Sequence, residues 1–226
     1  GDNAVEEGNE TELFRHDKRF EHGTAFGVRV SDTLEEEELE SKLAEIDRLE
    51  FERIGQILSL DLIAVTNESE SPEQFAKTVG RVNEGAEQPL VLMSDDPTAH
   101  EQALQLVAED KPLLYAATAD NYEEMAGLSS KHDCPLVVKA SDLDSLAELV
   151  EKVQEAGAEQ LVVSPQTGSL LGNMTALTQI RRLALRKKFR PFGHPTFIMP
   201  ETKDDPMEEA IEAGIYECKY GNFVIL

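Results

Sequence analysis

The chain has 226 residues, 40% of them hydrophobic and 29% charged, and its formal charge is −24 at pH 7. This length and composition predict one soluble globular domain with a substantial core. The charge argues against nonspecific binding to nucleic acid or to an anionic membrane, because either surface would repel the chain at long range. We find no apolar run of the roughly 18 residues that span a bilayer and no signal-peptide pattern. Two cysteines are too few for a disulfide framework, so we expect a reducing cytoplasm.

The first 12 residues, GDNAVEEGNETE, are acidic and lack periodic apolar positions, which predicts a mobile tail. Residues 13–22 carry Phe14 and Phe20 among basic side chains. We expect an extended lead-in whose aromatic rings pack against the lower end of the domain. The predicted domain runs from residue 13 to residue 226.

Eight short apolar runs follow, and a stretch with helical periodicity comes after each of the first seven. Continuous apolar runs without alternation fit strands that are covered on both faces. Strands that alternate with helices of this length form a parallel sheet. The predicted strands are residues 25–30, 60–66, 90–93, 113–117, 136–138, 161–163, 195–199 and 222–226.

The first helix is expected to begin at a capping box formed by Thr33 and Glu36 and to run to about Arg53. Its buried stripe is predicted to contain Leu39, Leu43 and Ile46, with Leu49 as a further candidate. Later helices are expected to start at polar residues, several of which precede a proline. These starts are Ser71, Asp96, a site near Asp120, Asp142, a site near Met174, and Asp205.

Eight strands with helical crossovers predict an α/β fold, a (β/α)8 TIM barrel that lacks its final helix. The alternative is an open doubly wound sheet, which usually has a glycine-rich first turn. The first turn here, VSDTLEEEE, contains no glycine, so the barrel is favoured. Without an eighth helix, apolar surface on the first and eighth strands should stay exposed. Either another segment covers that surface, or the chain is a piece of a longer protein.

Polar residues follow each predicted strand and should surround one mouth of the barrel, where barrel enzymes carry their chemistry. Converging carboxylates there could act as acid and base or hold a hard cation, but helix N-caps need the same side chains. Short amides and hydroxyls suit a neutral polar ligand, which favours Asn67, Ser94, Thr118 and Asn121. Together with Asp95, these residues form the predicted cofactor-binding set. The full set after the strands is Asp32, Asn67, Glu68, Asp95, Asp96, Asp120, Asn121, Asp142, Gln166, Thr167 and Glu201.

Two other patterns carry weaker predictions. A loop with Gly168 and Gly172 could hold a phosphate ahead of a helix, although it has no lysine and a plain loop is the simpler interpretation. His132 and Cys134 precede a strand, on the rim opposite the expected site. The five histidines show no paired metal spacing, so no metal site is predicted for this chain.

Residues 181–194, RRLALRKKFRPFGH, contain basic residues and no acidic ones in a strongly acidic chain. Such a local reversal of charge could dock an acidic partner, or it could be a solvated helix end whose cations offset the helix macrodipole. The predicted partner-docking residues are Arg181, Arg182, Arg186, Lys187, Lys188 and Arg190.

The sequence resembles the barrel domain of the large, or gamma, subunit of the corrinoid/iron–sulfur protein family. That family is part of the CO dehydrogenase/acetyl-CoA synthase system. The resembling stretches are FRHDKRFEHGTAFGVRVSDT, PLVLMSDDP, KPLLYAATADNYEEMAGL, CPLVVKASDLDSLAELVEKVQEAGAEQLVVSP, RRLALRKKFRPFGHPT and DPMEEAIEAGIYECKYG. Together they cover most of the chain from residue 13 onward.

The resemblance implies a methyl carrier, in which a cobalt corrinoid takes a methyl group from a methyl-tetrahydropterin and delivers it to acetyl-CoA synthase. It also implies a four-cysteine iron–sulfur cluster domain before the barrel and a corrinoid domain after it. This chain contains neither domain, so we expect no cofactor in it. The implied partners are the carrier's small subunit, acetyl-CoA synthase and a pterin methyltransferase.

Two functions follow as expectations. The first is a scaffold and subunit-docking domain of a methyl-transfer assembly, with corrinoid and cluster bound by segments outside this chain. The second is a stand-alone barrel methyltransferase that binds a methylated pterin through Asn67, Asp95, Asn121 and their neighbours. A stand-alone enzyme should encode the eighth helix, which favours the scaffold.

Overall fold

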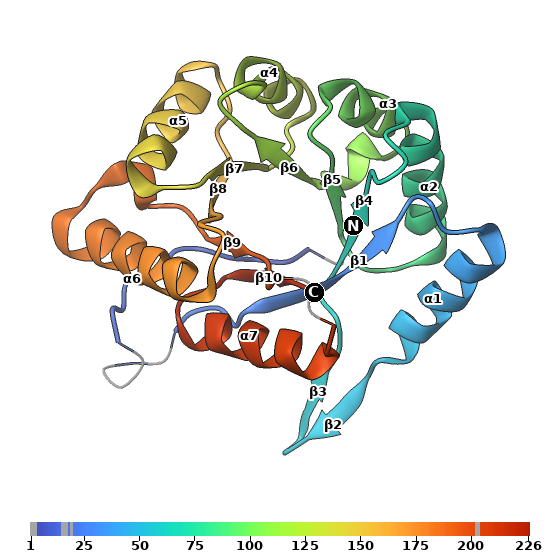
Figure 1. Cartoon of the computed structure of the whole chain (residues 1–226), viewed down its shortest axis with the longest axis horizontal. Helices are drawn as coiled ribbons and strands as arrows, with labels where there is room; N and C mark the ends of the chain where they lie inside the picture. Colours follow the sequence, from blue (N-terminus) through green and yellow to red (C-terminus); the bar gives the residue numbers. More distant parts are fainter. Residues whose placement is uncertain (1–3, 15–17, 19, 202–203) are drawn as a thin grey trace.

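The computed structural model describes residues 4–14, 18, 20–201 and 204–226, and Figure 1 shows a ring of strands inside a ring of helices. Within these residues, eight strands are paired in parallel in the order β8-β7-β6-β5-β4-β1-β10-β9. A bridge between Val163 and Thr196 joins the two ends of this order, and the Val163 N–H donates to the Pro195 carbonyl at 2.8 Å. The sheet is therefore a closed barrel, and the alternative of an open sheet is excluded.

Helices and strands alternate along the chain as predicted. The barrel strands are β1 (Ala25–Ser31), β4 (Leu62–Thr66), β5 (Leu90–Met93), β6 (Leu113–Ala117), β7 (Leu136–Ala140), β8 (Leu161–Pro165), β9 (Phe197–Ile198) and β10 (Phe223–Ile225). The outer helices are α1 (Glu36–Arg48), α2 (Pro72–Gly85), α3 (Pro97–Val107), α4 (Tyr122–His132), α5 (Leu143–Glu155), α6 (Leu170–Lys187) and α7 (Pro206–Cys218).

Three apolar clusters hold the ring together. One lies inside the barrel and is called here the inner core, and two lie between the strands and the helices, of which the larger is called the outer core. Val137 lies in the inner core, whereas its neighbour Val138 lies in the outer core with Phe75 and Leu146 from the helices. Successive strand residues point to opposite faces, and here both faces are covered, so both positions are apolar. Each fully buried side chain of this size stabilises the fold by about 1.5–3 kcal/mol. The strand ends, and the loops that leave them, are fixed by this packing.

The first helix is shorter than predicted. It ends at Arg48, and a hairpin follows, formed by β2 (Phe51–Arg53) and β3 (Gln56–Leu58) in antiparallel register. Leu49, the further candidate for the buried stripe, is exposed. The prediction that the helix reaches Arg53 was wrong because a two-residue turn at Ile54 and Gly55 reverses the chain there. Figure 1 shows this hairpin projecting from the barrel wall.

Two predicted helix starts were also wrong. Helix α1 is capped at Glu35, whose side chain forms the capping box with Glu38, in place of the predicted pair of Thr33 and Glu36. Helix α6 begins at Leu170, ahead of the predicted start, because the Ser169 side chain accepts a hydrogen bond from the Gly172 N–H. The glycine-bearing loop is therefore short, and its second glycine already belongs to the helix.

The amino-terminal segment lies against the lower end of the barrel, the end at which the strands begin. Val5 packs against the inner core, and the Asn222 amide donates to Glu7 Oε2 at 2.8 Å. Phe20 contacts the Tyr220 ring, which confirms that the lead-in places an aromatic ring there. Residues 1–3 of the tail, and residues 15–17 and 19 of the lead-in, lie outside the described residues. Mobility of the tail stays a prediction.

A groove of about 320 Å³ runs along the outer wall between α1 and α7. Val28 of β1 and Leu226 after β10 form part of its floor, and Ile46 and Leu49 line one side. Arg29 and Glu209, which pair at 3.3 Å, lie among its polar residues. The predicted apolar surface on the first and eighth strands is thus confirmed.

Candidate functional site

The carboxyl ends of the strands form the mouth of the barrel, where polar loops lead into the helices. Some of the predicted residues there are N-caps. Asp96 accepts a hydrogen bond from the Thr98 N–H at 2.8 Å, and Asp142 accepts one from the Ser145 N–H at 2.9 Å. The hydrogen bonds from Ser145 lower the pKa of Asp142. These bonds satisfy donors of the first helical turn, so the capping interpretation is confirmed for both aspartates.

Asp32 has a different structural role at the mouth. Its buried carboxylate accepts hydrogen bonds from the Glu68 and Ser69 N–H groups at 2.9 and 2.8 Å and from the Ser69 hydroxyl at 2.5 Å. The Gln74 side chain donates to the Asp32 carbonyl at 2.9 Å. Asp32 therefore anchors the loop between β4 and α2 and has no surface for a ligand.

The structure brings together the five residues of the predicted cofactor-binding set. The Asn67 amide donates to the Ser94 hydroxyl at 2.9 Å. The Asn121 amide donates to the Asp95 carbonyl at 3.1 Å, and its side-chain oxygen accepts from the Thr118 N–H at 2.7 Å. These contacts join the loops that follow β4, β5 and β6 into one cluster.

The members of this cluster differ in what they leave for a ligand. Both ends of the Asn121 side chain are used, because it also donates to the Ala116 carbonyl and accepts from the Thr118 hydroxyl. Among the described residues, by contrast, the side-chain oxygen of Asn67 is buried without a hydrogen-bond partner. A buried acceptor without a partner costs stability unless something donates to it. Ligand binding by the five residues stays a prediction, and Asn67 is its best-supported member.

A lysine and a tyrosine inside the mouth were missed by the sequence analysis. The Lys139 ammonium lies 5.1 Å from the centre of the Tyr115 ring and 3.2 Å from the Asp95 carboxylate. Burial raises the pKa of Tyr115, whose ring also contacts Phe197. Lys139 was missed because it stands near the end of an apolar run, LVVKA. The spacing could have indicated it, since a residue two positions after Val137 points to the same face of the strand, the inside of the barrel.

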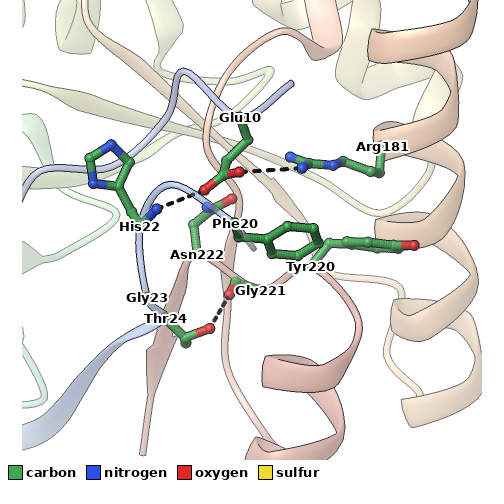
Figure 2. A pocket seen from close by; sticks show the side chains of 9 residues that line it. All are labelled: Glu10, Phe20, His22, Gly23, Thr24, Arg181, Tyr220, Gly221 and Asn222. Carbon is green, nitrogen blue, oxygen red and sulfur yellow. Dashed lines mark hydrogen bonds and ion pairs between the residues drawn. The ribbon is translucent and has the colours of Figure 1, made fainter. Parts of the chain in front are cut away.

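The lower end of the barrel holds a second polar cluster, shown in Figure 2. Arg181 reaches from α6 to Glu10, with a closest ion-pair distance of 3.6 Å, and only 13% and 6% of the two side chains are exposed. The guanidinium carbon lies 4.9 Å from the ring centre of Phe20 and 5.6 Å from that of Tyr220. The Glu10 carboxylate also accepts from the His22 N–H at 2.8 Å. The small pocket between these residues, about 20 Å³, has room for one water molecule.

Glu7 and Asp61 are two carboxylates at this end with raised pKa values. Burial raises the pKa of Glu7 to about 7, and the charges of Glu10 and Asp61 add to this effect, while the hydrogen bond from Asn222 opposes it. Burial also raises the pKa of Asp61, which accepts a hydrogen bond from the Phe26 N–H at 2.8 Å. The lower end therefore gathers acidic groups in a poorly solvated region.

The predicted docking residues separate into two groups. Arg181 is bound within the chain and is not part of an exposed surface. The other five are exposed and lie in the carboxyl-terminal part of α6 or just after it, at the lower end of the barrel: Arg182, Arg186, Lys187, Lys188 and Arg190, called here the basic cluster. Within it, the Arg186 guanidinium lies 5.8 Å from the centre of the Phe14 ring. Docking through the basic cluster stays a prediction.

In the described part of the chain, no group of three or more His, Cys, Asp or Glu residues has the arrangement of a metal site. Cys134 is buried and Cys218 is exposed. No helix among those described is both long and apolar enough to cross a bilayer.

Sequence comparison relates the chain to subunits of the CO dehydrogenase/acetyl-CoA synthase system. A family model described as CO dehydrogenase/acetyl-CoA synthase delta subunit matches residues 1–226. The corrinoid/iron–sulfur protein large subunit of Moorella thermoacetica is 45% identical over 226 residues, which are 100% of this chain and 50% of that protein. The gamma subunit of the acetyl-CoA decarbonylase/synthase complex of Methanothermobacter thermautotrophicus is 36% identical, over 96% of this chain and 48% of that protein. The chain thus spans about half the length of these relatives.

Solved structures support the barrel fold. Dihydropteroate synthase from Vibrio fischeri has a TM-score of 0.62 at 11% identity, covering 90% of this chain and 87% of that one. The Thermus thermophilus enzyme, solved with 6HMPPP, also has a TM-score of 0.62, at 18% identity and with the same coverage. At these identities the likeness establishes the TIM-barrel fold alone.

Proposed function

We propose that the chain, which belongs to the CO dehydrogenase/acetyl-CoA synthase delta subunit family, is the barrel domain of a corrinoid/iron–sulfur methyl carrier. The carrier passes a methyl group between a methyl-tetrahydropterin and acetyl-CoA synthase in the cytoplasm. The barrel acts in it as a scaffold and subunit-docking domain. Its partners are the carrier's small subunit, acetyl-CoA synthase and a pterin methyltransferase.

The basic cluster is the observation that carries the docking role. Its five side chains are exposed on a chain whose net charge is −24, so they form a local region of opposite sign. A patch of this kind attracts an acidic surface and orients it before contact, which raises the association rate. The acidic amino-terminal segment of this chain pairs with Arg181 and leaves the basic cluster exposed.

The residues of this chain do not fit the carrier's iron–sulfur cluster. A four-iron cluster is held by four cysteine thiolates, whereas this chain has only Cys134 and Cys218. Burial also raises the pKa of the Cys134 thiol to about 11, which disfavours the thiolate form that binds metal. In this proposal the cluster and the corrinoid are held by polypeptide outside this chain, and the barrel supplies docking surfaces.

Charge reversal tests the docking role. Replacing Arg186, Lys187 and Lys188 by Glu should slow association with the purified small subunit about tenfold at low salt. The difference should shrink as salt is added, because exposed charges are screened. The matched control reverses Lys42, Lys77 and Lys152, three exposed lysines elsewhere on the outer helices, and should have a smaller effect. Unchanged association kinetics in the triple variant would contradict the docking role of the basic cluster.

A second candidate function rests on the unsatisfied oxygen of Asn67. Asn67 bonds Ser94, the residue before the exposed Asp95, and its buried acceptor suits a polar heterocycle with N–H donors, such as a methylated pterin. In this alternative the chain is a barrel methyltransferase with the cofactor-binding set as its site.

Titration calorimetry separates the two functions. The scaffold predicts that the chain alone neither binds a methyl-tetrahydropterin tightly nor transfers its methyl group to free cobalamin. The methyltransferase predicts both, with binding weakened at least tenfold by Asn67→Ala. Asp120→Ala, at an exposed residue near the same mouth, serves as the control.

A further inference from the structure

The hairpin of β2 and β3 exposes apolar side chains on both of its faces. Ile54 at its tip is 94% exposed, and Phe51, Ile57 and Leu58 are between 41% and 67% exposed. The register pairs Phe51 with Leu58, whereas Ile57 is paired with Glu52 on the opposite face. An isolated two-stranded hairpin is only marginally stable in water, and clustered exposed apolar side chains mark interaction sites. The hairpin therefore has the features of a binding element.

The turn of the hairpin gives an independent indication. Ile54 and Gly55 form a two-residue turn with φ values of +53° and +73°. Such turns favour Asn-Gly, because a β-branched side chain is strained at positive φ. The chain thus places isoleucine where folding alone prefers asparagine, and leaves that side chain almost fully exposed. A residue that is unfavourable for the turn and unused within the fold is explained by contact with another molecule.

The family relationships of the chain indicate which molecule contacts the hairpin. The family model that matches the whole chain is described as a delta subunit, whereas the similar curated proteins are large or gamma subunits. One barrel family therefore supplies two different subunits of the same system. A second copy of this chain is disfavoured, because two chains of charge −24 repel each other.

We propose that the hairpin of β2 and β3 is the docking element for that second barrel, the small or delta subunit, with Ile54 buried at the contact. The inference deepens the proposed scaffold function and rests on it. The hairpin carries Glu52 and Arg53 and is preceded by Glu50, so its apolar tip has a mixed, slightly acidic border. The receiving surface is an apolar cleft with a basic border.

The hairpin and the basic cluster should affect different rate constants. Exposed charges at a rim act mainly on the association rate, whereas a buried apolar anchor slows dissociation. A change at Ile54 should therefore accelerate dissociation and leave the association rate and its salt dependence nearly unchanged.

The decisive variant is Ile54→Asn. The docking role predicts that it weakens binding, whereas the turn geometry predicts that it keeps or raises the stability of the chain. Relief of the strained turn should leave the thermal midpoint of the chain equal or higher. The dissociation constant for the purified small subunit should rise about tenfold or more, mainly through faster dissociation. Leu171→Asn is the control, since Leu171 is 75% exposed on α6, away from the hairpin. It should leave the dissociation constant unchanged.

The outcomes separate this inference from the function on which it rests. If wild-type chain binds the small subunit and Ile54→Asn binds equally well, the docking role of the hairpin is overturned and the scaffold function stands. If wild-type chain forms no complex with the small subunit, the scaffold function itself is contradicted. If wild-type chain instead forms a homodimer that Ile54→Asn disrupts, the choice of partner is overturned.

Discussion

Both ends of the barrel hold the ring of parallel strands together, but they do so with different interactions. At the mouth, hydrogen bonds such as those of Asn121 join adjacent loops. At the lower end, a segment from the start of the chain crosses the strands and is held by the pair of Arg181 and Glu10. The mouth is therefore organised mainly by hydrogen bonds between neighbouring loops, and the lower end by a buried ion pair between α6 and the start of the chain. Disturbing the two ends should have different consequences.

The largest expected effect is at the lower end. Arg181→Ala should reduce the free energy of unfolding by about 3 kcal/mol, because it leaves the Glu10 carboxylate buried without its cation. Urea denaturation followed by circular dichroism measures this loss. The neighbouring exposed residue gives the control, Arg182→Ala, which should stay within about 0.5 kcal/mol of wild type. Equal effects of the two substitutions would contradict the assignment of Arg181 as the anchor of the amino-terminal segment.

At the mouth, Asn121→Ala should cost about 2 kcal/mol of unfolding free energy. The substitution leaves the Thr118 N–H and the Asp95 carbonyl without their partners. The comparison variant is Asp120→Ala at an exposed position, and a difference of less than about 0.5 kcal/mol between the two would show that the loops hold together without Asn121.

The lower end should respond to pH near neutrality. The pKa of Glu7 is about 7 in the folded chain against 4.5 for the ordinary side chain, so the folded state binds this proton more tightly. Stability should therefore fall as pH rises from about 4.5 through 7. Because Glu7 is only partly buried, solvent screens the loss to about 1–2 kcal/mol. Urea midpoints across this range should fall less for Glu7→Gln than for wild type, and parallel curves would contradict the buried position of Glu7.

The smallest effect is expected where the mouth is solvated. Asp95→Asn removes the partner of Lys139, but the carboxylate is largely exposed, so stability should change by less than about 0.5 kcal/mol. Thermal unfolding at low salt measures it. A loss above about 1.5 kcal/mol would show that the mouth, too, depends on an ion pair, and would remove the contrast between the two ends.

Most of the barrel was predictable because its signals are local. Runs such as Leu113–Ala117 are buried on both faces, and caps such as Asp96 and Asp142 mark helix starts with their own side chains. The hairpin was not predictable, because its turn has Ile54 where the usual signal is asparagine. Leu49 also continued the helical pattern beyond Arg48.

The position of the candidate site was predictable from the sequence, but the hydrogen bonds within it were not. The ends of β4, β5 and β6 placed Asn67, Ser94 and Thr118 at one mouth, as their sequence positions required. The loop geometry decides which of these side chains bond to one another and so leave no atoms for a ligand. No local sequence pattern encodes that geometry. The same limit applies to Arg181, which looked like part of a basic surface until Glu10, distant in sequence, was found beside it.

The central claim, that this barrel is a docking scaffold, is tested most directly by titrating the purified small subunit into the chain in a calorimeter. The account predicts saturable binding at one small subunit per chain, weakened by added salt. Absence of binding heat at low salt, with no co-elution of the two proteins, would contradict it.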